Sequence, residues 1–250
     1  MDRLTYPDIA RIFGTGLIST GVGLLLFVVV TVTWGDPFTR LSASGEQRKL
    51  EKILDASLPT AGQLQGSAAL DSQLTLRAAT LAKKQTPLGQ VAGRLRIPEL
   101  GKQWGFVNGA RNGTSDLTKG PGLYKETPFP GAGRPIAIAG HRTTYGAPFL
   151  NIDRLKPGHT IILQMRYGTF TYTVTRQRII NPDDWSILRP GELEQVPARR
   201  AAVTRSGRCF GQTCEHLVLT ACHPKYSAAK RLAVFARLTG VQLTKGSAAA

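Results

Sequence analysis

The feature that most constrains this chain is an uncharged apolar run near its N-terminus. Residues 12–34 read IFGTGLISTGVGLLLFVVVTVTW, without one charged side chain. About 20 apolar residues suffice to cross a bilayer as a helix. Arg11 and Trp34 flank the run and suit the two membrane interfaces. Because no small-residue cleavage site follows and the run exceeds the apolar region of a usual signal peptide, we predict a retained transmembrane anchor.

Charges beside this run do not decide its orientation. Two basic residues, Arg3 and Arg11, precede it, and four follow it: Arg40, Arg48, Lys49 and Lys52. Counted simply, these charges would keep the C-terminal side in the cytoplasm. A long following domain can cross the membrane regardless of them, so the charges leave the orientation open.

We predict five regions along the chain. Helical spacing at Leu50, Ile53, Leu54 and Leu58 indicates a helix after the anchor, and residues 74–84 suggest a second short one. The regions are a tail at 1–11, the anchor at 12–34, a helical or linker stalk at 35–88, a folded domain at 89–244 and a tail at 245–250.

The folded domain carries most of the basic charge. The chain has a formal net charge of +16, and residues 89–250 hold 23 Lys and Arg against 9 Asp and Glu. These charges are scattered among apolar and turn residues, and the one grouping lies in a predicted loop: Arg199, Arg200, Arg205 and Arg208. The pattern favours a solvated basic surface, suited to anionic envelope polymers, over a nucleic-acid site.

Short strand-like segments recur in this domain, with few long helical patterns between them. RYG joins two of them, which predicts a hairpin; in the second, Phe170, Tyr172 and Val174 share one face and the threonines share the other. This spacing predicts a mainly β fold, a closed barrel or a sandwich. The segments are 93–100, 134–140, 160–165, 169–180, 216–222 and 231–239.

Three cysteines raise the question of chemistry. Cys209 and Cys214 enclose four residues in a glycine-containing loop, and outside the cytoplasm they are natural disulfide partners. Cys222, in LVLTACHPKY, is then left over. It can be an inert core thiol, a nucleophile, or a zinc ligand together with the other cysteines, His216 and His223. The spacing lacks the paired knuckles of structural zinc sites, which disfavours zinc.

A nucleophilic thiol needs a base or a cation, because at its ordinary pKa of about 8.5 it is mostly protonated at neutral pH. His141 directly follows an apolar strand and opens the polar loop HRTTYGAPF, a place where functional groups are often displayed. Arg231 would return beside Cys222 if the last two strands are antiparallel neighbours, and could then stabilise an oxyanion. Other histidines fit less well: His159 lies in a turn, His216 has no evident partner, and His223 would face away from its neighbour.

These residues carry a family resemblance. AIAGHRTTYGAPF, LVLTACHP and YSAAKRL resemble the His, Cys and Arg motifs of sortases, most closely the class E sortases of Gram-positive actinobacteria. GRLRIPELG, GPGLYKETPFPG, IDRLKPGHTI and NPDDWSIL resemble further family segments. The resemblance covers about residues 90–240. It implies a sortase-type closed β-barrel of about eight strands with short helices, a cytoplasmic tail, a single membrane span and an extracellular catalytic domain.

The resemblance also implies a reaction. Cys222 would be the nucleophile, His141 the general acid and base, and Arg231 the oxyanion stabiliser, and substrate contacts would come from Thr143, Thr144, Tyr145 and Ala221. The enzyme would cleave an LPxTG-like or LAxTG-like sorting signal of a secreted protein after Thr, through a thioacyl intermediate. An amine of a peptidoglycan precursor or a pilin lysine would then accept the protein. No cofactor and no metal are expected, since no acidic cluster is evident.

Two departures and two alternatives accompany this hypothesis. Ala221 stands where the family usually has threonine, and residues 191–215 form a longer segment than usual before the Cys strand. A membrane-anchored envelope-binding scaffold without turnover, or a thiol peptidase that only hydrolyses, would keep the same fold. A cysteine L,D-transpeptidase is disfavoured because LTACHPK does not match an S-x-G-C-R-like motif.

The expected pairing of Cys209 with Cys214 gives a first prediction. A Cys209–Cys214 bridge should brace the segment before the Cys222 strand, and closing so short a loop should stabilise the fold by roughly 2 kcal/mol. The oxidised secreted domain should therefore show one reactive thiol under denaturing conditions. A count of three free thiols would refute the bridge.

Overall fold

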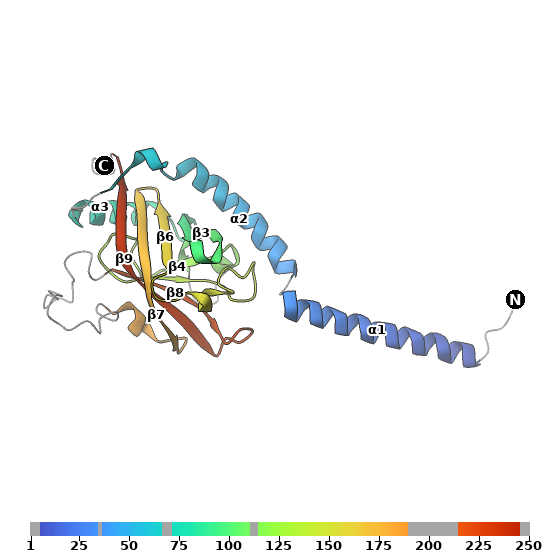
Figure 1. Cartoon of the computed structure of the whole chain (residues 1–250). Helices are drawn as coiled ribbons and strands as arrows, with labels where there is room; N and C mark the ends of the chain where they lie inside the picture. Colours follow the sequence, from blue (N-terminus) through green and yellow to red (C-terminus); the bar gives the residue numbers. More distant parts are fainter. Residues whose placement is uncertain (1–5, 35–36, 67–71, 111–114, 190–214, 246–250) are drawn as a thin grey trace.

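In the described part of the chain, eight strands close into a barrel, and a ninth, short strand pairs with the end of one of them (Figure 1). The computed structural model describes residues 6–34, 37–66, 72–110, 115–189 and 215–245. Within them the strands are β1 (Leu64–Gly66), β2 (Val91–Ile97), β3 (Lys102–Ala110), β4 (Gly122–Tyr124), β5 (Ile136–Ala139), β6 (Thr160–Met165), β7 (Gly168–Ile180), β8 (His216–His223) and β9 (Lys230–Thr244).

The sheet order is β1-β9-β7-β6-β2-β3-β4-β5-β8, and pairing of β8 with β9 closes the ring. Two pairs, β3–β4 and β5–β8, are parallel, and the other pairs are antiparallel. Closure leaves no free edge along β8, because β5 binds one side of it and β9 the other. The barrel predicted from the sequence is confirmed.

Helices surround the barrel and precede it. They are α1 (Tyr6–Trp34), α2 (Pro37–Ser57) and α3 (Ser72–Gln85), with short 3-10 helices η1 (Ala61–Gln63), η2 (Pro98–Leu100), η3 (Ser115–Thr118), η4 (Ile152–Arg154) and η5 (Trp185–Leu188). Figure 1 shows α1 projecting away from the barrel. Among the described residues, α1 is the one helix whose length and composition suit a membrane span, with a mean hydropathy of 2.1 over Ala10–Val30.

The β6–β7 hairpin shows why these residues form a barrel wall. Its strands are joined at Met165↔Gly168 by a two-residue turn, as RYG predicted. Along β7, Phe170, Tyr172 and Val174 are at most 2% exposed, while the threonines between them are half-buried. Strict alternation turns one face of the strand to the barrel interior, where the large side chains exclude water.

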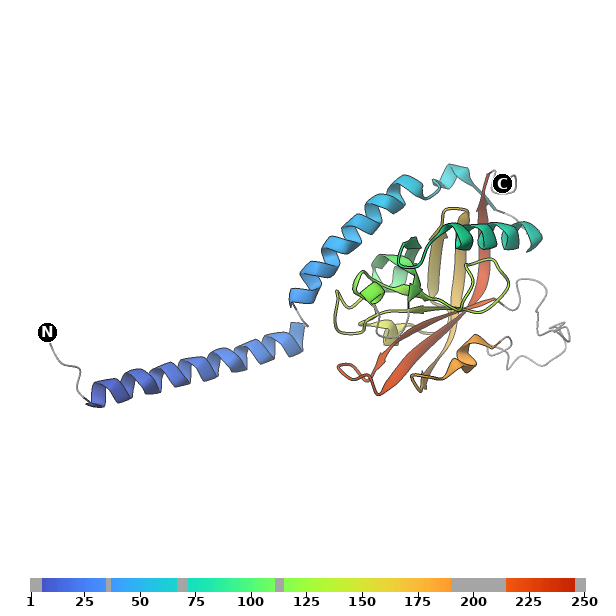
Figure 2. The same cartoon turned by 180° about the vertical axis from the view of Figure 1, so that it is seen from behind.

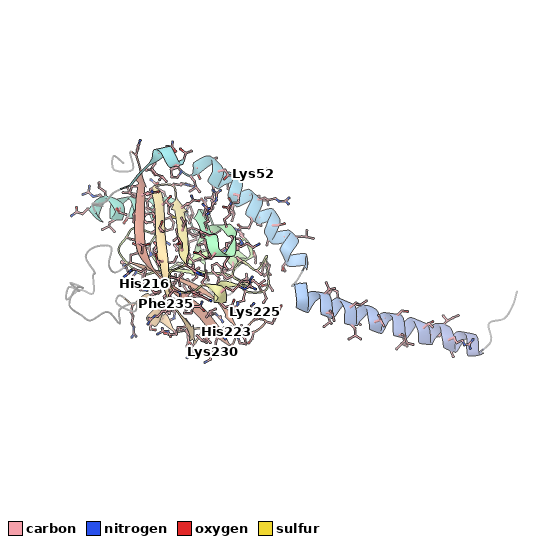
Figure 3. The ribbon with its side chains drawn as sticks, viewed as in Figure 1. Lys52, His216, His223, Lys225, Lys230 and Phe235 are labelled. Atoms are coloured by element: carbon pink, nitrogen blue, oxygen red, sulfur yellow. The ribbon has the colours of Figure 1, made fainter. Side chains whose placement is uncertain are left out.

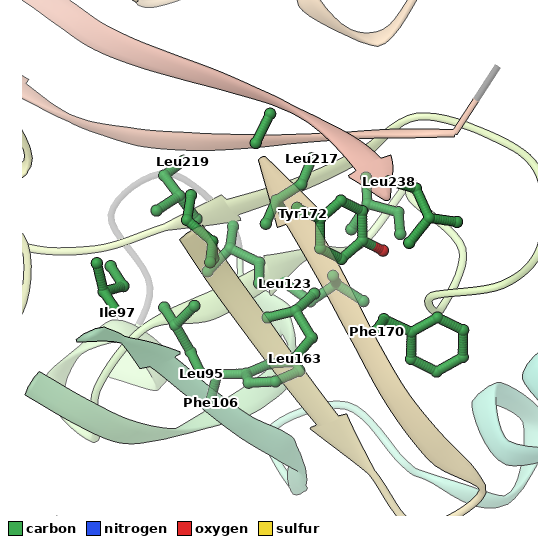
Figure 4. Packing of buried hydrophobic residues seen from close by; sticks show 14 of the residues in the cluster. Leu95, Ile97, Phe106, Leu123, Leu163, Phe170, Tyr172, Leu217, Leu219 and Leu238 are labelled. Atoms are coloured by element: carbon green, nitrogen blue, oxygen red, sulfur yellow. The ribbon is translucent and has the colours of Figure 1, made fainter. Parts of the chain in front are cut away.

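The interior is filled by branched and aromatic side chains from every long strand (Figure 4). Leu95, Phe106, Leu163, Leu217 and Leu219 belong to this core and are fully buried. A second, smaller cluster lies on the outer face of β5, β8 and β9 and at the end of β7, under η5. Its members are Ala137, Ile180, Ile187, Val218, Ala233 and Phe235.

The region predicted as a stalk, 35–88, is in contact with the barrel. In α2, Leu50 and Leu54 are buried against Val91 and Val107. β1 pairs with the end of β9, and α3 adds Ala78 and Ala79 to the main core. Figures 1 and 2 show both helices lying beside the barrel. The domain boundary at residue 89 stays a prediction, although α2, β1 and α3 all pack on the barrel.

Close approach of α2 explains why β3 escapes detection in the sequence. A Cβ at Gly105 would lie 2.9 Å from Cβ of Leu50, so a side chain there would displace the helix. Gly105 and Gly109 interrupt the apolar alternation by which a strand is recognised. β4, with three residues, is too short to give a pattern.

A buried carboxylate fixes the start of β8. Glu215 is 1% exposed and accepts hydrogen bonds from the backbone N–H groups of Gly131 and Gly133, each at 2.9 Å, and from the Tyr172 hydroxyl at 2.7 Å. Burial raises the pKa of Glu215, and these three donors oppose that rise. The carboxylate thereby ties β8 to the loop before β5 and to β7.

Docking of α2 leads to a prediction on stability. Leu54→Ala should lower the free energy of unfolding by about 2–5 kcal/mol, because Leu54 is 1% exposed and its loss leaves a cavity. Ile53 is 48% exposed on the same helix, and Ile53→Ala should change stability by no more than about 0.5 kcal/mol. Urea unfolding of the full chain in detergent, followed by near-UV circular dichroism, compares them. Equal effects would contradict docking of α2 in solution.

Candidate active site

The end of β8 carries Cys222 beside a cation. Cys222 is the penultimate residue of this strand, half-buried, with a free thiol. In the antiparallel β8–β9 ladder, Cys222 and Arg231 are direct register partners. Side chains of directly paired residues lie on the same face about 5 Å apart at their Cβ atoms. The predicted neighbourhood of Cys222 and Arg231 is confirmed.

His141 reaches the same level from the other side of β8. β5 runs parallel to β8, with Ala139 opposite Thr220, and the Gly140 N–H donates to the Thr220 carbonyl at 3.0 Å. Two residues beyond these partners the chain reaches His141 on one side and Cys222 on the other, so the parallel register brings both residues to the same end of β8. A Cβ at Gly140 would lie 2.5 Å from the ring of Phe149, so only glycine lets the following loop fold back at this point.

Alternation decides which side chains of β8 face the site. Leu217, Leu219 and Ala221 belong to the interior core, whereas Val218 belongs to the outer cluster under η5. Cys222 continues the outer series. The opposite face receives His223, whose Nδ1 lies 3.4 Å from Nη1 of Arg142.

His141 is held in a compact loop. Its carbonyl accepts from the Phe149 N–H at 3.1 Å, and its Nδ1 lies 3.2 Å from the Thr144 hydroxyl. The ring of Tyr145 stacks on the imidazole with centroids 4.8 Å apart. Burial lowers the pKa of His141 below its ordinary value of 6.5 because the interior disfavours imidazolium. At neutral pH the ring is therefore mainly neutral.

The guanidinium of Arg231 is oriented by its own loop. Its Nη1 donates to the carbonyls of Ala228 at 2.8 Å and Lys230 at 3.0 Å. The planar group is thereby fixed, and within the described part of the chain its Nε and Nη2 N–H groups have no hydrogen-bond acceptor. These groups can serve an oxyanion that forms near Cys222.

Tyr124, at the end of β4, completes this outer face. Its hydroxyl lies 3.0 Å from the Thr220 hydroxyl, and its ring meets Trp185 edge to face at 6.0 Å. Burial raises the pKa of Tyr124; the hydroxyl of Thr220 and the charge of Arg231 oppose the rise, and Cys222 adds to it. The residue is therefore electrostatically coupled to both, although nothing in the sequence pattern singled it out beyond its place in GPGLYKETPFPG.

Comparison with known families decides the identity of this arrangement. Residues 95–239, which span β2 to β9 and contain all three candidate residues, match the Sortase domain family. The chain belongs to the sortase family.

Individual relatives agree with this result. Over 136 residues this sortase is 30% identical to "Sortase D" of Bacillus subtilis strain 168, covering 54% of this chain and 56% of that protein. Over 230 residues it is 23% identical to "Sortase SrtE1" of Streptomyces coelicolor, covering 92% of this chain and 57% of that protein. The chain thus spans somewhat over half the length of these two curated relatives.

A solved structure supports the fold. The SrtF sortase from Corynebacterium diphtheriae superposes with a TM-score of 0.54 at 25% identity, covering 64% of this chain and 90% of that one. Together with the sortase E relative of Streptomyces, the family match bears out the resemblance to class E sortases.

Remaining histidines of this sortase lie in other settings. His216 is buried, with Nε2 2.9 Å from the Ile187 carbonyl, a partner that the sequence did not suggest. Nδ1 of His159 accepts from the Lys156 N–H inside a turn. Figure 3 labels His223 at the last residue of β8, beside Lys230 of β9, and His216 at the first residue of β8. Within the described ranges, no three His, Cys, Asp or Glu side chains gather to hold a metal ion.

The predicted substrate contacts separate into two groups. Thr143, Thr144 and Tyr145 lie in the His141 loop and are half-buried. Ala221 is 2% exposed and faces the core, so a threonine hydroxyl at that position would need a buried partner. The predicted Cys209–Cys214 bridge lies outside the described residues. The substrate contacts and the bridge stay predictions.

Burial of His141 leads to a prediction on its titration. In the full chain in detergent, the His141 ring should titrate below pH 6.5, and Tyr145→Ala should raise the midpoint because it uncovers the ring. NMR of ¹³C-labelled histidine measures both midpoints. Tyr226→Ala, on a loop tyrosine that is 60% exposed, should leave the midpoint unchanged. A wild-type midpoint at or above 6.5 would contradict the burial argument.

The same shift sets a direction for stability. A folded-state pKa below the unfolded value of 6.5 means that the folded protein binds this proton less readily. The contribution of His141 to stability is therefore complete above pH 6.5 and is lost as the pH falls through the folded pKa.

Proposed function

We propose that this sortase is a membrane-anchored cysteine transpeptidase whose catalytic groups are Cys222, His141 and Arg231. The observation that carries the proposal is the double register of β8, which sets Arg231 directly opposite Cys222 and brings the chain to His141 two residues past the last β5–β8 partners. The two registers bring three groups from distant sequence positions to the same end of β8, and together they have the chemistry that thiol acyl transfer needs.

The first half-reaction would be acylation. The Cys222 thiolate attacks the Thr carbonyl carbon of an LAxTG-like or LPxTG-like sorting signal and forms a tetrahedral oxyanion. Arg231 donates hydrogen bonds to that oxygen. Collapse breaks the Thr–Gly bond as protonated His141 gives its proton to the departing glycine amine. A thioester between Cys222 and Thr remains, with His141 neutral.

The second half-reaction would be transfer to an amine. An amine of a peptidoglycan precursor or of a pilin lysine attacks the thioester carbon while neutral His141 takes its proton. A new amide forms, and the enzyme returns to its starting form with a Cys222 thiolate and a protonated His141, which is the minor form at neutral pH because burial lowers the pKa of His141. The lowered pKa of His141 suits the deprotonation step, because the buried ring is ready to accept a proton at neutral pH.

The membrane location of the reaction rests on α1. A helix with no charged side chain between Ile12 and Val30 and apolar side chains exposed along its length suits a single membrane span. We place the barrel on the extracellular side, where secreted proteins with a C-terminal sorting signal and the wall precursors that accept them are both present.

Peptide cleavage tests the proposal. Full-chain protein in detergent, incubated with LAxTG and LPxTG peptides and triglycine, should release the C-terminal fragment and form the triglycine product. Cys222→Ala should abolish both; His141→Ala should lower kcat by about 10²–10⁴-fold. Arg231→Ala should lower it by about 10²–10³-fold. The pH profile of kcat/KM should show two ionisations, with the acid limb below pH 6.5.

A control on the same strand separates the role of Arg231 from a general loss of charge. Arg237 is exposed on β9, and Arg237→Ala should keep wild-type activity. Absence of a thioacyl adduct and of cleavage would favour a non-catalytic scaffold. Release of the fragment without any triglycine product would leave a thiol peptidase that only hydrolyses. A profile with a single ionisation would exclude His141 as the acid.

A further inference from the structure

The parallel ladder between β5 and β8 stops one hydrogen bond short of the nucleophile. Its last bond runs from the Gly140 N–H to the Thr220 carbonyl at 3.0 Å. In a regular parallel ladder the next bond would run from the Cys222 N–H to the Gly140 carbonyl, and the one after it from the backbone N–H of residue 142 to the Cys222 carbonyl. The chain leaves the strand at His141, so that backbone donor is displaced.

The side chain of Arg142 takes the place of its own backbone donor. Its Nη1 donates to the Cys222 carbonyl at 3.3 Å. The side chain is 3% exposed, although arginine is among the residues least often buried. A half-buried carbonyl at the end of an interrupted ladder thereby receives a donor, while the chain around His141 departs from strand geometry.

The Arg142 guanidinium makes three further contacts. Its Nε donates to the Leu150 carbonyl at 3.4 Å, and its Nη2 lies 3.0 Å from Oδ1 of Asp153 in η4. Its Nη1 also lies 3.4 Å from Nδ1 of His223. The planar Arg142 guanidinium, which comes from the start of the loop that begins with His141, therefore links β8 to Leu150 and Asp153 at the far end of that loop. Lysine has a single nitrogen and no fork with which to do this.

We propose that Arg142 is the positioning residue that fixes Cys222 and His141 relative to each other. This inference rests on the proposed transpeptidase function of those two residues. Arg142 is not itself a catalytic residue, because its N–H groups are directed at the protein and its side chain is closed to a substrate. Its effect is on geometry, since a displacement of about 1 Å between reacting groups can lower a rate by about 10²-fold.

The decisive variant is Arg142→Lys in the full chain in detergent. With LAxTG peptide and triglycine, it should lower kcat by about 10²-fold. Its KM should stay within about twofold of wild type, because no substrate contact is removed. Arg94→Lys is the matched control: Arg94 is also a largely buried arginine, paired with Glu51 and Asp55 of α2, away from the site. It should keep the wild-type kcat.

A second readout uses no substrate. Alkylation of Cys222 by iodoacetamide, mapped to that residue by peptide mass spectrometry, should follow two ionisations in wild type and one in His141→Ala. The profile of Arg142→Lys should resemble that of His141→Ala, because the ionisation of Cys222 no longer depends on the protonation of His141. Arg94→Lys should keep the two-step profile. A purely structural loss of stability would not give this difference.

Each outcome bears on the inference separately from the function. A wild-type kcat together with a two-step alkylation profile in Arg142→Lys would overturn it. If that variant fails to fold, Asp153→Asn decides, since it keeps Arg142 and removes its carboxylate anchor; an unchanged kcat and profile there would overturn the inference too. If wild type cleaves no peptide, the proposed function fails, while the alkylation profiles still decide whether Arg142 couples Cys222 to His141.

Discussion

The pairing of β8 on both of its edges is the interaction on which the rest of this sortase depends. β9 binds one edge antiparallel and β5 binds the other in parallel. Antiparallel pairing sets Arg231 directly opposite Cys222, whereas parallel pairing carries the chain from β5 to His141 at the same level. The same ladders close the barrel, so formation of the fold and assembly of the site are one event.

Buried charges hold both ends of β8. At its start, the Glu215 carboxylate accepts from the backbone of Gly131 and Gly133 and from Tyr172. At its end, the Arg142 guanidinium donates to the carbonyl of Cys222. Each charge is costly to bury and is compensated by several directed hydrogen bonds. Such bonds specify one position for the strand, which apolar packing alone does less sharply.

Much of the barrel was predictable because it depends on local alternation. The β6–β7 hairpin follows from the two apolar faces and the RYG turn, and the β8–β9 pair follows from two apolar segments joined by a short loop. β3 was not predictable, since Gly105 and Gly109 serve the approach of other elements rather than the strand itself. Ile53 fits the helical spacing of α2 but is 48% exposed, because the position of the barrel, and not the period, selects the buried face.

Residue type and short-range spacing were enough to determine the apolar segment of α1, several strands of the barrel and the candidate residues Cys222, His141 and Arg231. Long-range packing alone decided that the predicted stalk contacts the barrel and that Tyr124 adjoins the site. It also decided that His216 bonds to the Ile187 carbonyl and that Arg142 reaches Cys222. The hydrogen bonds among these contacts join residues 29 to 96 positions apart, and no local pattern records which distant group will satisfy a buried donor or acceptor.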